Sequence, residues 1–188
     1  GQESNAAMEV VGIVDPVPSN SRFWNELQDK KIPVYPSMDE FYREKKADLA
    51  IISTPIEFHT GQILKALENG SHVLCEKPLC GDARDIETLI AARNRAGKNV
   101  YVGYQWSFNP AIQALKNDVM AGVFGKAIEF RTLILWPRDS DYYGRTTGWA
   151  GKIASKSGAL IYDSVANNAA AHYLHNMFFV TGDALDTA

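Results

Sequence analysis

Several features that mark other classes of protein are scarce or absent in this chain of 188 residues. It has no excess of basic residues: 19 Lys and Arg against 22 Asp and Glu leave a net charge of −3. That balance argues against a nucleic-acid-binding surface, which needs a basic footprint. No apolar run reaches the roughly 18 residues of a membrane-spanning helix. With 46% hydrophobic and 22% charged residues, the composition is typical of a soluble globular protein.

Cysteine is also rare, which limits the metal sites and the redox environments that are compatible with the sequence. The two cysteines, Cys75 and Cys80, are spaced Cys-x4-Cys, whereas a zinc site needs about four ligands with closer pair spacing. The pair His172-x-x-His175 is a weak metal signal, because no third ligand is evident. We therefore expect no metal and two reduced thiols, which suits a reducing compartment and a cytoplasmic location.

The phosphate-binding turn Gly-x-Gly-x-x-Gly occurs nowhere in the chain. A dinucleotide-binding half usually begins with a strand, this turn and a helix, followed by an acid roughly 20 residues on. Asp15 fits that acid, because it ends the first apolar run, and counting back places the glycines before residue 1. We expect the chain to be part of a longer protein that lacks its first strand here. The alternative is a natural protein without a phosphate loop.

Strand and helix patterns alternate over the first hundred residues. Strands are predicted at 8–15, 32–35, 47–53, 72–75 and 99–104, and helices at 21–30, around Phe41 and Tyr42, at 60–68 and at 82–96. Ser37 and Glu40 form a capping box at the start of the second helix. This alternation with short loops predicts an α/β fold, a doubly wound parallel sheet with helices on both faces.

The pattern changes after residue 105, and we place a boundary there between domains 1–105 and 106–188. A helix is predicted at 110–120, and the strict alternation of 127–136 predicts a half-exposed strand of an antiparallel sheet. Residues 137–158 are predicted to form a loop over a site, and 159–180 to be mostly helical. Because one long strand cannot bury its face alone, we expect only part of an α+β domain with a mostly antiparallel sheet.

Three motifs lie where the predicted strands end. They are Thr54-Pro55-Ile56-Glu57-Phe58-His59, Gly70-Ser71-His72-Val73-Leu74-Cys75-Glu76-Lys77-Pro78-Leu79 and Val102-Gly103-Tyr104. Ligands of such sheets bind at the carboxyl ends of the strands, which makes Lys77 a functional candidate. Together the motifs resemble the glucose-fructose oxidoreductase/inositol dehydrogenase (Gfo/Idh/MocA) family. The resemblance implies an NAD(P)-dependent oxidoreductase that acts on a hydroxyl of a sugar, inositol or related polyol.

The resemblance also implies which residues are catalytic. In relatives the motif lysine, here Lys77, lies near the nicotinamide and the reacting hydroxyl, where a cation or proton relay lowers the barrier. Relatives often carry Asp-x-x-x-His in the last helix; Asp163 fits the aspartate, but Asn167 stands at the histidine position. If the helix begins after Asp163, Asn168 and His172 face the pocket. We predict Lys77, Asp163 and His172 as catalytic, with Asn167 as the alternative to His172.

The implied cofactor is NAD, with NADP less favoured. Asp15 would accept hydrogen bonds from the adenosine ribose and repel a 2′-phosphate, although it is alternatively a turn acid. Glu76 would orient Lys77 or contact the nicotinamide ribose. Relatives often carry arginine where this chain has Ser107, so one expected charge is missing from the pocket. The full set of predicted cofactor-binding residues is Asp15, Ser53, Thr54, Pro55, His59, Glu76, Lys77, Gln105 and Trp106; His59 is alternatively a cap or surface residue.

Residues 136–152 are dense in aromatic and cationic side chains. Aromatic faces stack on sugar rings, and Arg and Lys bind hydroxyls or carboxylates; the alternative is a surface loop that packs its own aromatics. The predicted substrate-binding residues are Arg138, Tyr143, Arg145, Trp149, Asn167 and Asn168.

Two other functions remain open at this stage. One is a glycosidase-like relative that retains NAD and works by transient oxidation and elimination. The other is a non-catalytic, ligand-sensing relative, favoured by the missing histidine at position 167. The family resemblance further implies a homo-oligomer, a dimer or tetramer, paired through the open face of the second sheet.

Overall fold

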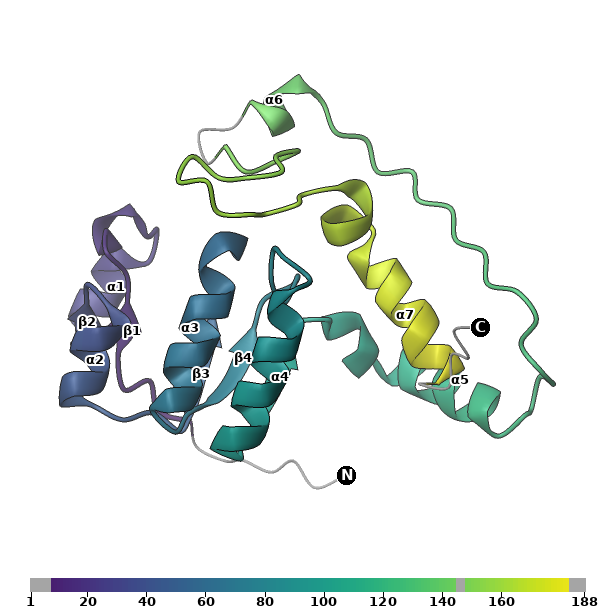
Figure 1. The fold of residues 1–188 in the computed structure, drawn as a ribbon, viewed down its shortest axis with the longest axis horizontal. Helices are drawn as coiled ribbons and strands as arrows, with labels where there is room; N and C mark the ends of the chain where they lie inside the picture. The colour runs from purple at the N-terminus through teal and green to yellow at the C-terminus, as the bar shows by residue number, and fades with distance from the viewer. Residues whose placement is uncertain (1–7, 145–147, 183–188) are drawn as a thin grey trace.

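The first half of the chain alternates strands and helices, as its sequence predicts (Figure 1). The computed structural model describes residues 8–144 and 148–182. Its strands are β1 (Ile13–Val14), β2 (Val34–Tyr35), β3 (Leu49–Ile52), β4 (His72–Cys75) and β5 (Val100–Val102). Between them lie the short turn η1 (Pro18–Asn20) and the helices α1 (Trp24–Asp29), α2 (Met38–Glu44), α3 (Ile56–Glu68) and α4 (Asp85–Ala96).

Local signals set the ends of these helices. The Ser37 hydroxyl accepts a hydrogen bond from the Glu40 amide at 3.2 Å, which confirms the predicted cap of α2. Helix α4 ends at Gly97, whose φ of 62° is a left-handed conformation that glycine adopts without steric cost. Helix α3 begins at Ile56, directly after Pro55, rather than at the predicted Thr60.

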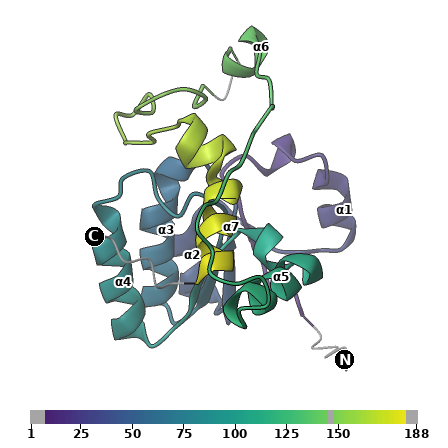
Figure 2. The same cartoon turned by 90° about the vertical axis from the view of Figure 1, so that its right-hand side faces the viewer.

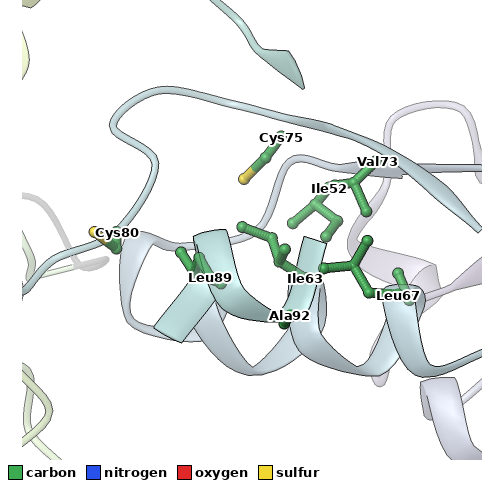
Figure 3. Close-up of a cluster of buried hydrophobic side chains, with 9 residues drawn as sticks. Ile52, Ile63, Leu67, Val73, Cys75, Cys80, Leu89 and Ala92 are labelled. Carbon is green, nitrogen blue, oxygen red and sulfur yellow. The ribbon is translucent and has the colours of Figure 1, made fainter. Parts of the chain in front are cut away.

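The strands pair in parallel as two sheets, β1-β2 and β3-β4-β5. Ile52, Val73 and Cys75 point from the second sheet into a core formed with α3 and α4, where Ile63 and Leu89 are buried (Figure 3). Helices therefore cover this face of the sheet.

The opposite face of β3-β4-β5 carries exposed side chains among the described residues. Ile51 is 69% exposed and Tyr101 is 53% exposed, so within residues 8–144 and 148–182 this face is open. The placement of α3 and α4 on one face has a topological reason. The order β3-β4-β5 advances in one direction, and successive right-handed crossovers in one direction place their helices on the same side.

The second half contains η2 (Gln105–Phe108), α5 (Pro110–Met120), α6 (Ser140–Tyr143), the π-helical turn η3 (Val165–Ala169) and α7 (Ala171–Thr181). Helices α5 and α7 lie side by side in both views (Figures 1 and 2). Among the residues that the structure describes, no helix has the length and apolar character to cross a membrane.

The strand predicted at 127–136 is not formed. The segment runs as an extended connection between α5 and α6 (Figure 1), and its Ile128 and Leu133 side chains are 94% and 81% exposed. A strand needs a partner for its backbone hydrogen bonds, and the described residues supply none here. The antiparallel pairing that they do show is the single bridge between Ala154 and Leu160. The mostly antiparallel second sheet is therefore not confirmed.

Candidate functional site

The ends of three parallel strands gather the sequence motifs at one edge of the sheet. Ile52 pairs with Cys75, and Cys75 pairs with Val102, so β3, β4 and β5 end side by side. Beyond the strands, the Glu76 amide donates to the Ile52 carbonyl at 2.8 Å, and the Gly103 amide donates to the Cys75 carbonyl at 2.7 Å. This edge is where doubly wound sheets bind their ligands.

Lys77 reaches from this edge to the second half of the chain. Its Nζ donates to the side-chain Oδ1 of Asn168 at 2.5 Å and to the Asn168 backbone carbonyl at 3.1 Å. The Asn168 Nδ2 donates in turn to Asp163 Oδ1 at 2.8 Å. Because the carboxylate only accepts hydrogen bonds, it holds the amide with its nitrogen toward Asp163 and its oxygen toward Lys77.

The segment around Asp163 is fixed by its backbone. Tyr162 adopts a φ of 48°, a left-handed conformation that is uncommon for an aromatic residue. The Asp163 amide donates to the Lys152 carbonyl at 2.9 Å, and Asp163 Oδ2 accepts from the Gly151 amide at 2.6 Å. Asp163 thus joins the 149–152 loop to the lysine network.

The residue that meets Lys77 lies in the π-helical turn η3. Its hydrogen bond from the Ala170 amide to the Val165 carbonyl spans five residues, where an α-helix spans four. Asn168, five residues after Asp163, is the residue of this turn that accepts from Lys77, whereas the Asp-x-x-x-His spacing points to position 167. π-Turns of this kind occur frequently at functional sites.

Asn167 itself has a local structural role. Its amide donates to the Ser164 hydroxyl at 3.0 Å, which caps η3, and its Nδ2 donates to the Tyr162 carbonyl at 3.2 Å. Of these two neighbouring residues, Asn168 rather than Asn167 is hydrogen-bonded to Lys77.

His172 lies in an aromatic slot beside the network. It is 8% exposed, stacks on Trp106 with ring centroids 4.8 Å apart, and meets Tyr104 edge-on at 5.7 Å. Its buried Nδ1 has no hydrogen-bond partner among the described residues. Burial, together with the positive charge of Lys77, lowers the pKa of His172.

Ser107, which replaces the arginine of many relatives, is buried against α7. Its hydroxyl lies 2.6 Å from His175 Nε2, and His175 stacks on Tyr104 at 4.1 Å. Where many relatives carry the charged arginine, this chain therefore has a short serine–histidine contact between η2 and α7. Sequence reasoning did not assign a partner to Ser107, and the contact joins residues 68 positions apart.

The pKa of Lys77 is lowered, chiefly by burial, while the charges of Glu76 and Asp163 oppose the shift. A lysine with a lowered pKa releases its proton more readily near neutral pH. The geometry and the electrostatics of this edge therefore fit a group that transfers protons.

The position of His59 differs from the expected one, in which its side chain contacts the cofactor. It is 1% exposed, and its ring nitrogens lie 2.8 Å from the Pro78 carbonyl and 2.9 Å from the Thr54 carbonyl. The ring is thus held inside the protein behind Lys77.

The residues present fit the adenosine end of a dinucleotide. Asp15 directly follows β1 and accepts from the Val17 amide at 2.8 Å. It borders a hollow of about 370 Å³ that is lined mainly by apolar side chains, among them Ile13, Phe23 and Leu27. A carboxylate beside an apolar hollow suits a ribose next to a base.

Three of the predicted substrate-binding residues, Arg138, Tyr143 and Trp149, belong to a cation–aromatic cluster. The Arg138 guanidinium lies 4.1 Å from the Trp136 ring centroid and 4.6 Å from that of Tyr142. Tyr142 meets the rings of Tyr143 and Trp149 edge-on. The aromatics therefore pack on one another, as the alternative of a self-packed loop predicts. Arg145 lies outside the described residues.

The fold and this site define a dinucleotide-binding α/β protein with a partly buried lysine at the carboxyl edge of its sheet. The chain belongs to the glucose-fructose oxidoreductase/inositol dehydrogenase family. The matching family model, described as an oxidoreductase family with an NAD-binding Rossmann fold, covers residues 1–104, more than half of the chain. The predicted family and its NAD-binding Rossmann fold are thereby confirmed.

Curated relatives carry several activities. The chain is 30% identical over 112 residues to inositol 2-dehydrogenase of Rubrobacter xylanophilus, covering 58% of this chain and 31% of that protein. It is 27% identical over 136 residues to 1,5-anhydro-D-fructose reductase of Ensifer adhaerens, covering 71% and 39%. It is 29% identical over 96 residues to 2,7-anhydro-N-acetylneuraminate hydratase of Escherichia coli, covering 51% and 26%. The chain spans less than half the length of each of these relatives.

Solved structures support the same fold. The WlbA dehydrogenase of Bordetella pertussis, in complex with NADH and UDP-GlcNAcA, matches with a TM-score of 0.74 and 24% identity, covering 93% of this chain and 48% of that one. The apo scyllo-inositol dehydrogenase of Lactobacillus casei matches with a TM-score of 0.52 and 25% identity, covering 60% and 33%.

Proposed function

We propose that this protein is an NAD-dependent oxidoreductase that transfers a hydride between the nicotinamide and a hydroxyl-bearing carbon of a sugar, inositol or related polyol. The observation that carries the proposal is the Lys77 ammonium, bonded to Asn168 at the carboxyl edge of a Rossmann sheet. Relatives named inositol 2-dehydrogenase and 1,5-anhydro-D-fructose reductase support this class of substrate.

Lys77 is the proton-transferring group in this mechanism. Its Nζ makes two hydrogen bonds to Asn168. One direction at the nitrogen is therefore left for the substrate oxygen; it carries a proton in the ammonium form and a lone pair in the neutral amine. In the oxidative direction the neutral amine accepts the hydroxyl proton as the carbon is oxidised, and the lowered pKa of Lys77 favours that form. The bound nicotinamide supplies the site that accepts or donates the hydride.

Asp163 and His172 support the lysine in different ways. Asp163 orients the Asn168 amide and keeps a negative charge near the ammonium. We retain His172 as a second acid–base group, because its lowered pKa keeps it neutral and its Nδ1 is unpartnered within the described residues.

The cofactor assignment rests on the residues that line the two ends of the proposed site. Asp15 beside its hollow favours NAD over NADP, because a carboxylate repels a 2′-phosphate. We propose that the strand-end residues Ser53, Thr54, Glu76 and Gln105 contact the cofactor. Arg138, Tyr143 and Trp149 then line the substrate side.

A second candidate function is a reaction without net redox, in which the retained NAD oxidises the substrate transiently. The observation that favours it is the relation to two proteins named 2,7-anhydro-N-acetylneuraminate hydratase, from Escherichia coli and Mediterraneibacter gnavus, the latter matched over 89% of this chain.

One experiment separates these functions. The purified protein is incubated with NAD and a panel of sugars, inositols and anhydro-sugars, while NADH absorbance and product masses are followed. Net NADH formation supports the dehydrogenase. Substrate conversion at constant NADH, abolished when bound NAD is removed, supports the redox-neutral reaction. Ligand binding without conversion of any compound refutes both and supports a sensing role.

We further propose a cytoplasmic location and a homo-oligomer. The free thiols Cys75 and Cys80 support a reducing compartment. Ile128, Leu133 and Leu135 are each more than 80% exposed, and exposed apolar surface of this kind supports pairing with a second copy. Light scattering that gives the mass of a single chain would contradict the oligomer.

A further inference from the structure

Behind the lysine motif, the His59 ring connects two loops that end neighbouring strands. His59 lies in the first turn of α3. One ring nitrogen lies 2.9 Å from the carbonyl of Thr54, just after β3, and the other lies 2.8 Å from the carbonyl of Pro78, the residue after Lys77. We infer that His59 is a positioning residue, which sets the place of Lys77 relative to the ends of β3 and β4. The inference rests on the proposed function of Lys77.

The backbone around Lys77 has few other supports. At one end of the motif, the Glu76 amide donates to the Ile52 carbonyl at 2.8 Å. The Lys77 amide contacts the carboxylate of its own neighbour, Glu76, at 3.2 Å, and Pro78 has no amide proton to donate. Among the described backbone contacts, the bond from His59 to the Pro78 carbonyl is therefore the tertiary anchor at the far end of the motif.

The chemistry of the ring suits a bridge of this kind. Both partners are carbonyl oxygens, which only accept hydrogen bonds. A neutral imidazole donates to one of them, and the imidazolium donates to both. The two nitrogens are held apart by a rigid ring, so the side chain also sets the spacing between the loops. An amide side chain, with both donors on a single nitrogen, cannot span the same gap.

Burial separates this role from cofactor binding. His59 is 1% exposed and both ring nitrogens face protein carbonyls, so it acts on the reaction through Lys77. Catalysis is sensitive to such placement, because a displacement of about 1 Å at the reacting groups lowers the rate by about a hundredfold.

The test uses His59→Phe, which keeps a ring and removes both nitrogens, with His59→Gln as the conservative variant. The matched control is Thr60→Val, which removes the neighbouring hydrogen bond of α3, from the Thr60 hydroxyl to Asp85 at 2.8 Å. Steady-state kinetics should show kcat about ten- to a hundredfold lower in His59→Phe, with KM for NAD changed less than about threefold. His59→Gln should fall between His59→Phe and the wild type.

A second readout does not depend on turnover. The rate at which an amine-reactive reagent labels Lys77, followed by mass spectrometry, should rise in His59→Phe and stay unchanged in Thr60→Val. If the wild type shows no turnover, the proposed function fails while the labelling still tests the placement of Lys77.

Three outcomes would overturn the inference. In the first, His59→Phe has wild-type kcat and wild-type labelling. In the second, Thr60→Val loses as much kcat as His59→Phe, which indicates general destabilisation. In the third, His59→Phe does not fold and His59→Gln behaves as the wild type in both readouts.

Discussion

Replacing Asn168 with alanine should break the hydrogen-bond network that joins Lys77 to Asp163. The change removes the Oδ1 that accepts from Lys77 at 2.5 Å and the Nδ2 that donates to Asp163 at 2.8 Å. A hydrogen bond to a charged group contributes about 1.5–3 kcal/mol, and about 1.4 kcal/mol corresponds to tenfold in rate. If the bond acts in the transition state, kcat/KM should fall by about ten- to a hundredfold.

The matched control lies next to it in the same turn. Asn167→Ala removes only the 3.2 Å contact to the Tyr162 carbonyl and should leave kcat/KM within about threefold, since a bond between neutral groups contributes about 1 kcal/mol or less. Initial rates with NAD and the best polyol substrate measure both variants. Equal losses in the two variants, or a larger loss in Asn167→Ala, would refute the assignment of the central amide to Asn168.

The pH dependence of kcat in Asn168→Ala should shift in a defined direction. The Asn168 oxygens accept from the ammonium form of Lys77 and so stabilise the charged state. Losing the side-chain oxygen should lower the pKa of Lys77 beyond the lowering by burial. The rise of kcat with pH should therefore move to lower pH in Asn168→Ala. A shift to higher pH would contradict this account.

Three further predictions concern the scaffold. Gly81→Ala should lower the melting temperature and kcat together, because its Cβ would overlap the Leu160 carbonyl; an unchanged protein would refute that close contact. Ile63→Ala, at a fully buried core position, should cost about 2–5 kcal/mol of unfolding free energy in urea titrations, whereas Ile90→Ala, at a 46% exposed position, should cost about 0.5 kcal/mol. Burial raises the pKa of Cys75 from 9.0 to about 12. The contribution of the buried neutral thiol to the unfolding free energy should therefore be full below pH 9.0 and be lost as the pH rises toward 12. A Cys75→Ala variant should show a smaller decline in unfolding free energy over this range.

The sequence was informative where a signal acts over a few residues. The Ser37 cap and the alternation of apolar runs with helical patterns both predict elements that the structure contains. These signals work because capping and backbone conformation depend on nearest neighbours along the chain. The family motifs behaved similarly, since their residues lie at the ends of β3, β4 and β5.

Features that depend on contacts between distant segments were not available from sequence patterns. Whether 127–136 forms a strand depends on a pairing partner, which alternation alone does not supply. His59 was expected near the cofactor surface, yet its burial depends on how α3 packs behind the loop after β4.

The candidate site also combines features that the sequence determines with features that only the tertiary structure determines. The sequence alone identified the family, the parallel α/β architecture and Lys77, because all three are carried by local motifs and by periodicity. Only the tertiary structure shows Asn168 as the partner of Lys77, because that contact joins residues far apart in the chain. A linear spacing specifies neighbours only within one regular helix, and Asp163 lies before Ser164, the N-cap of η3, so the residues that meet Asp163 depend on the fold.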